Sequence, residues 1–108
     1  MSASRLALSE LAVADILEQA AWYEAQADAE LAKRWEDAVT AALLRICEMP
    51  NTGAPCSFSA KELEGARRVS VQGFSRHLIF YQSRKSEIVV LRIVHGARDL
   101  ESLFSGQK

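Results

Sequence analysis

Two short apolar runs dominate the last third of the chain, at residues 77–81 and 88–94. Both are rich in β-branched and aromatic residues, and the polar residues 83–86 separate them. Runs of this length and composition favour buried strands over helices. The pattern predicts a β-hairpin that follows a turn at residues 73–75 and ends in a backbone turn at Gly96.

The first half of the chain has the spacing of two helices. After a brief alternating segment at residues 5–8, Ser9 has the form of a helix cap, and Asp28 can cap a second helix. We expect helices over residues 10–24 and from Asp28 to about residue 48, where Pro50 stops the pattern. Apolar residues three and four positions apart predict the buried faces, which are Val13, Ile16, Leu17, Ala20 and Tyr23 in the first helix and Leu31, Trp35, Ala38, Ala42, Leu43 and Ile46 in the second.

The remaining segments complete an α+β pattern. Residues 60–63 offer one short turn of helix, residues 67–71 alternate as a strand, and residues 99–104 predict a short C-terminal helix. The order predicts a single domain over residues 1–108. We expect a short N-terminal strand and an antiparallel helical hairpin, packed on a mostly antiparallel sheet of three to four strands.

Composition and charge indicate a globular domain without a membrane-spanning segment. With 49% apolar and 25% charged residues, the chain is typical of a globular domain. No run approaches the roughly 20 apolar residues that span a bilayer, and the start lacks a signal-peptide core, so we expect a cytoplasmic protein. Residues 1–60 carry 4 Lys/Arg against 9 Asp/Glu, whereas residues 61–108 carry 9 against 5. The strand-rich half is therefore basic, which fits a nucleic-acid-binding surface or, at least as well, lysines and arginines at solvent-facing positions of the sheet and its loops.

The cysteines and histidines offer little metal or redox chemistry. The chain has two of each, with no Cys-x-x-Cys or His-x-x-x-His pair. We therefore expect no metal site and no cofactor. Without a secretory signal, Cys47 and Cys56 are expected to be free thiols.

Four motifs occur in an order known from a toxin family. They are Pro50 to Gly53, Arg67 to Val69, His77 to Tyr81, and Arg92 to Asp99. With the helical hairpin before them, they resemble the ParE branch of the RelE/ParE toxin superfamily. The resemblance implies a RelE/ParE-like fold and the toxin of a type II toxin–antitoxin system. It also implies neutralisation by a ParD-like antitoxin of the ribbon-helix-helix type, which alone would contact DNA, and inhibition of DNA gyrase as the toxic action.

Two alternatives to this function stay open. RelE-like relatives are ribosome-dependent mRNA endonucleases, which need an acid, a base and cations around the scissile phosphate. Phe104 stands near the position where such nucleases carry a tyrosine, and a phenyl ring cannot exchange a proton. His77 or His95 would have to replace it. The second alternative is a binding module of the same fold that is not toxic.

The candidate functional residues fall into two groups. For target binding or other function we select Arg68, Arg76, His77, Arg92, His95 and Arg98. For antitoxin binding we select Trp22, Trp35, Arg67, Arg84 and Tyr81. Structural roles compete with both assignments, because a strand histidine or a helix tryptophan commonly packs in the core, and Arg98 with Asp99 can simply cap the last helix.

Overall fold

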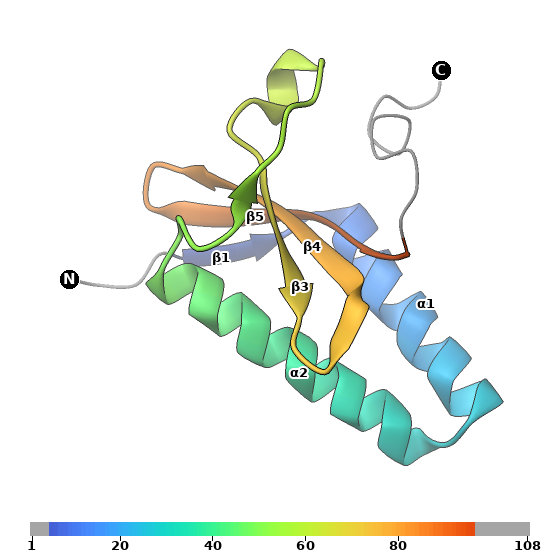
Figure 1. Ribbon diagram of the computed structural model, residues 1–108. Helices are drawn as coiled ribbons and strands as arrows, with labels where there is room; N and C mark the ends of the chain where they lie inside the picture. Colours follow the sequence, from blue (N-terminus) through green and yellow to red (C-terminus); the bar gives the residue numbers. More distant parts are fainter. Residues whose placement is uncertain (1–4, 97–108) are drawn as a thin grey trace.

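The computed structural model describes residues 5–96 (Figure 1). The elements are β1 (Arg5–Leu8), α1 (Glu10–Gln26), α2 (Ala29–Glu48), β2 (Ala54–Pro55), the 3-10 turn η1 (Lys61–Leu63), β3 (Arg67–Val71), β4 (Phe74–Arg84) and β5 (Glu87–His95). The helix expected at residues 99–104, together with Arg98, lies outside the described residues. Within the described part, no helix is both long and apolar enough to cross a membrane.

The five strands form one sheet in the order β1-β5-β4-β3-β2. The pairs β5–β4, β4–β3 and β3–β2 are antiparallel, whereas β1 runs parallel to β5. The mostly antiparallel α+β fold was predicted, but the expected three to four strands are too few. The additional strand β2 is only two residues long and contains Pro55, so its sequence had indicated a loop. Strand β4 is also longer than expected, because it begins at Phe74, a residue assigned to the turn.

Both predicted helix caps are present. The Ser9 hydroxyl accepts a hydrogen bond from the Ala12 amide at 3.0 Å, and the Asp28 carboxylate accepts one from the Leu31 amide at 2.8 Å. Each satisfies an amide that the first helical turn leaves without a partner. The caps therefore fix where α1 and α2 begin.

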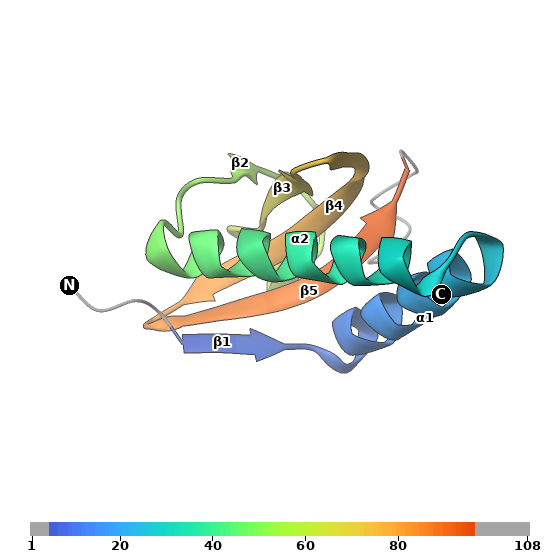
Figure 2. The same ribbon diagram turned by 90° about the horizontal axis from the view of Figure 1, so that it is seen from below.

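The two helices cover one face of the sheet unequally. Figure 2 shows α2 lying across the sheet, while α1 runs past its end beside β5. Of the face predicted for α2, Trp35, Ala42, Leu43 and Ile46 are buried, whereas Leu31 and Ala38 are half-buried. The prediction for α1 was wrong at Val13 and Leu17, which are 44% and 64% exposed. Because α1 meets only the border of the sheet, it buries a narrow stripe around Ala12.

The second face of the sheet is partly covered by the segment before β3. The Phe58 and Phe80 rings lie 6.1 Å apart between centroids. The Gln82 amide nitrogen donates to the carbonyls of Glu62 and Glu64 at 2.7 and 3.0 Å. Phe80 therefore packs on this face, whereas the neighbouring Tyr81 belongs to the core under the helices. Successive side chains of a strand point to opposite faces of the sheet, so only one of these two rings faces the helices.

Candidate functional site

Two histidines meet where β4 begins and β5 ends. His77 and His95 lie opposite each other in the ladder, and the next pair is joined by a hydrogen bond from the Gly96 amide to the Arg76 carbonyl at 2.7 Å. Opposite residues of an antiparallel ladder alternate between hydrogen-bonded pairs and pairs without hydrogen bonds, whose side chains stand closer. His77 and His95 form a pair of the second kind, and their rings lie 4.6 Å apart.

His77 is held inside an aromatic cluster. It is 2% exposed, its Nε2 shares a hydrogen bond of 2.9 Å with the Tyr23 hydroxyl, and its ring lies 5.3 Å from the Trp35 ring. Burial, and to a smaller extent the charge of His95, lowers the pKa of His77 to about 4. His77 is therefore neutral near pH 7 and shielded from solvent, as expected of a packing residue. His95, in contrast, is exposed.

Arg92 is bound to the first helix by an ion pair. Its Nε lies 2.8 Å and its Nη2 3.0 Å from the two carboxylate oxygens of Asp15, and the two side chains are 18% and 11% exposed. The hydrogen bonds to Asp15 raise the pKa of Arg92 above its ordinary value. A bulge in β5 lies next to this ion pair. Phe80 pairs with Arg92 and Tyr81 with Val90, so one residue of β5 is left over, and Asp15 also accepts a hydrogen bond from the Ile93 amide at 2.9 Å.

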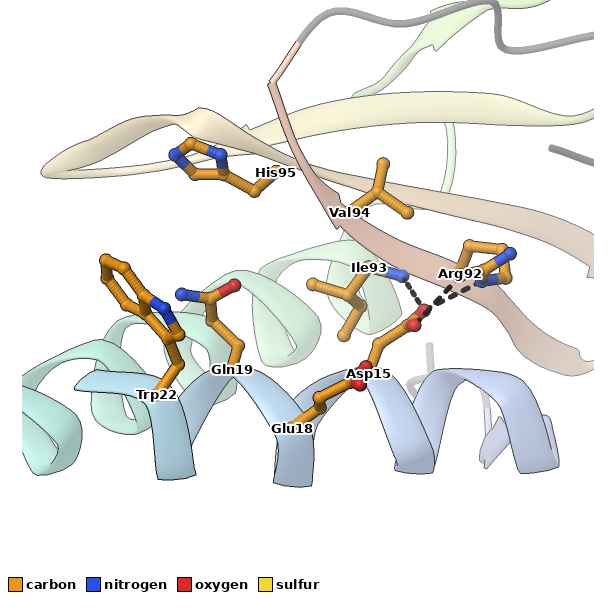
Figure 3. Close-up of a pocket in the computed structure, with 8 residues that line it drawn as sticks. All are labelled: Asp15, Glu18, Gln19, Trp22, Arg92, Ile93, Val94 and His95. Carbon is orange, nitrogen blue, oxygen red and sulfur yellow. Dashed lines mark hydrogen bonds and ion pairs between the residues drawn. The ribbon is translucent and has the colours of Figure 1, made fainter. Parts of the chain in front are cut away.

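A hollow of about 360 Å³ opens beside this ion pair, between α1 and the end of β5. Glu18, Gln19 and Trp22 of α1 and Val94 and His95 of β5 line it. Figure 3 shows Gln19 and Trp22 pointing from α1 toward β5. Trp22, a predicted antitoxin contact, is 55% exposed and forms one wall. Sequence reasoning had not selected Asp15, Glu18 or Gln19.

The remaining candidate arginines differ in how firmly they are held. The Arg67 Nη1 donates to the Gly53 carbonyl at 2.6 Å, and the Arg84 Nη2 donates to the Gln82 side chain. Arg68 and Arg76 are exposed. Arg76 also lines a hollow of about 280 Å³ that includes His77 and His95. The structure thus brings Arg76, His77 and His95 together at one end of the sheet and places Arg67 and Arg84 elsewhere.

Two residues chosen as antitoxin contacts are core residues instead. Trp35 and Tyr81 are both fully buried. The Tyr81 hydroxyl donates to the Pro50 carbonyl at 2.8 Å and accepts from the Gly53 amide at 2.9 Å, which fastens the loop after α2 to the sheet. Because neither side chain reaches the surface, we correct both assignments to structural roles.

The cysteines are free thiols in the structure, as expected. Cys47 is buried and Cys56 is half-buried. Burial raises the pKa of both thiols, and the nearby Arg68 partly offsets this for Cys56. Over residues 5–96, no three His, Cys, Asp or Glu side chains are grouped so that they could hold a metal ion.

Comparison with known proteins agrees with this architecture. The sequence pattern of a family described as "ParE toxin of type II toxin-antitoxin system, parDE" matches residues 6–100. A solved structure described as "Chromosomal ParDE TA system from P. aeruginosa" has a similar fold, with a TM-score of 0.72 at 18% identity over 87% of this chain and 97% of that one. A search of curated proteins finds no match. From the match over most of its length, the chain belongs to the ParE toxin family of type II toxin–antitoxin systems.

Proposed function

We propose that this ParE-family toxin stops growth by binding DNA gyrase in the cytoplasm, and that a ParD-like antitoxin neutralises it. The antitoxin part is supported by the solved relative, which is described as a ParDE system. The gyrase part is supported by the resemblance to ParE toxins and by the way the candidate side chains are used in the fold. In this proposal the toxin inhibits by occupying its target and needs no bond-making step of its own.

The observation that carries the proposal is that the fold itself holds the groups a nuclease would need. An RNA-cleaving toxin needs an acid and a base that reach the substrate, and cations that contact the phosphate. His77 is buried and hydrogen-bonded to Tyr23, and Arg92 is paired with Asp15. Both side chains stabilise the end of the sheet, which favours binding over catalysis.

One observation favours the RelE-like alternative. His95 is an exposed imidazole, and it lines the same hollow as the exposed Arg76. A histidine beside an arginine is a minimal pair for proton transfer near a phosphate. Under this alternative, His95 is the acid or base of an mRNA endonuclease.

Growth arrest with two parallel readouts separates the functions. We expect induced wild-type protein to reduce plasmid supercoiling while ribosome-bound mRNA stays intact. The His95→Gln variant should keep at least most of this effect, because an amide can preserve a contact but not proton transfer.

Charge reversal in Arg76→Glu should weaken the arrest if this end of the sheet contacts the target. Intact supercoiling with mRNA cleavage that His95→Gln abolishes would replace the gyrase proposal by the nuclease. Folded protein with neither effect would identify a non-toxic binding module.

A further inference from the structure

The outer edge of β5 loses its neighbouring strand halfway along. Strand β1 pairs with β5 only over Glu87–Val90, and the last bond of this pair runs from the Ser9 amide to the Val90 carbonyl at 3.0 Å. There the chain turns into α1. From Leu91 onward, no described strand lies on this side of β5. An unpaired edge of this kind offers backbone donors and acceptors to another chain.

The two ends of this open edge differ. At Ile93 the amide is already bound by the Asp15 carboxylate, which takes the place of a strand. At His95, no strand of residues 5–96 occupies this edge. Since the opposed His77 and His95 form a pair without hydrogen bonds, the amide and carbonyl of His95 point away from β4. They point toward the side where α1 and β5 enclose the hollow of about 360 Å³.

The side chains around this hollow carry an excess of negative charge. Its described lining contains two carboxylates, Asp15 and Glu18, against one guanidinium, Arg92. Arg92 is engaged by Asp15, so Glu18 supplies the carboxylate that has no ion pair within the described part. Trp22 lies one turn further along α1 and presents a half-exposed ring. A carboxylate and an indole on neighbouring turns of one helix favour the long side chain of a lysine or arginine that crosses both.

We propose that an extended segment of the antitoxin lies in this hollow, hydrogen-bonds to the outward amide and carbonyl of His95, and places a basic side chain between Glu18 and Trp22. The proposal rests on the proposed function, because it assigns a docking site to the antitoxin. Although the strand-rich half of the chain is basic, this site selects a basic contact from the partner.

The first test measures the affinity of the purified toxin for the ribbon-helix-helix-type protein encoded beside its gene. Trp22→Ala should weaken binding by about 30-fold or more, the loss typical of a buried aromatic anchor. Glu18→Lys should weaken it by about tenfold, with a smaller difference at high salt because screening reduces charge repulsion. Glu36→Lys is the matched control, since it makes the same change on the exposed face of α2. We expect it to bind like the wild type.

The second test addresses the backbone contact. The His95→Pro variant lacks the outward amide and loses no hydrogen bond to β4. His95→Ala is the matched control, because it removes the imidazole and keeps the amide. We expect His95→Pro to bind about five- to tenfold more weakly than His95→Ala, the loss of one backbone hydrogen bond. Thermal unfolding shows whether each variant is folded. If His95→Pro is not folded, the surface variants Trp22→Ala and Glu18→Lys still test the docking site.

The outcomes separate this docking site from the function on which it rests. If the wild type forms no complex with the neighbouring protein, the antitoxin part of the proposed function is wrong, and this site falls with it. If the wild type forms the complex, the docking site alone is wrong under three results together. These are that Trp22→Ala binds like the wild type, Glu18→Lys like Glu36→Lys, and His95→Pro like His95→Ala. Stronger binding by Glu18→Lys would show that the partner's contact here is acidic and would overturn the inferred charge.

Discussion

Lowering the pH should destabilise this protein through one buried histidine. His77 is neutral in the fold, where burial lowers its pKa from the ordinary 6.5 to about 4. In the unfolded chain it regains its ordinary pKa and binds a proton between these two values. The unfolded state therefore binds more protons than the folded state, so stability is complete above about pH 6.5 and falls as the pH decreases toward 4.

The size of the effect follows from the two pKa values. A lowering from 6.5 to about 4 corresponds to about 3 kcal/mol in full. About 2 kcal/mol of this should be lost between pH 7 and pH 5. His77 is only 2% exposed, so solvent screening reduces this figure little. The Tyr23 hydroxyl that contacts His77 has its pKa raised by burial and stays protonated throughout this range.

Urea unfolding at pH 7, 6 and 5 measures this loss. His77→Gln keeps a polar group near the Tyr23 hydroxyl and cannot titrate, so its stability should fall by about 2 kcal/mol less than that of the wild type over this range. His95→Gln is the matched control. It removes the exposed imidazole, and because burial is the main cause of the lowered His77 pKa, it should retain most of the wild-type dependence. The reasoning fails if an NMR titration finds His77 protonated near pH 6.5, or if His77→Gln loses as much stability as the wild type.

Three substitutions test other parts of the structure by urea unfolding. Tyr81→Phe leaves the buried Gly53 amide without its acceptor and should cost about 1–3 kcal/mol; an unchanged midpoint would mean that the loop does not depend on this hydroxyl. Gly53→Ala places a Cβ 2.7 Å from the Tyr81 hydroxyl and should cost a similar amount, about 1–3 kcal/mol, unless the loop shifts freely. Asp15→Asn leaves the Arg92 guanidinium mostly buried without a counter-charge and should cost up to about 3 kcal/mol, whereas a loss below about 0.5 kcal/mol would show that water replaces the pair.

Local signals predicted where the helices start and that two long strands follow, although β4 extends beyond its predicted bounds. Ser9 and Asp28 cap the helices because their side chains bind amides three residues away, which is a relation within one short segment. Most of the apolar face of α2 was predicted for a similar reason, since that helix lies across the sheet and buries the stripe around Trp35. These features follow from the spacing of neighbouring residues.

The parts that depend on distant contacts were not predicted. Leu17 has the same spacing pattern as buried residues, but its exposure depends on α1 running past the end of the sheet. Asp15 and Arg92 are 77 positions apart, and the bulge that brings them together has no glycine or proline to mark it. The candidate site shows the same limit. Trp22 was selected from the sequence as a possible partner contact, whereas Glu18 becomes relevant only once β5 lies opposite α1.

A supercoiling assay with purified components tests the central claim most directly. The toxin is titrated into DNA gyrase with relaxed plasmid and ATP, and a parallel reaction contains ribosomes and a translated mRNA. We predict that the toxin inhibits supercoiling, that His95→Gln inhibits it comparably, and that the mRNA remains intact. Full gyrase activity at saturating toxin, together with cleavage of the ribosome-bound mRNA, would contradict the account.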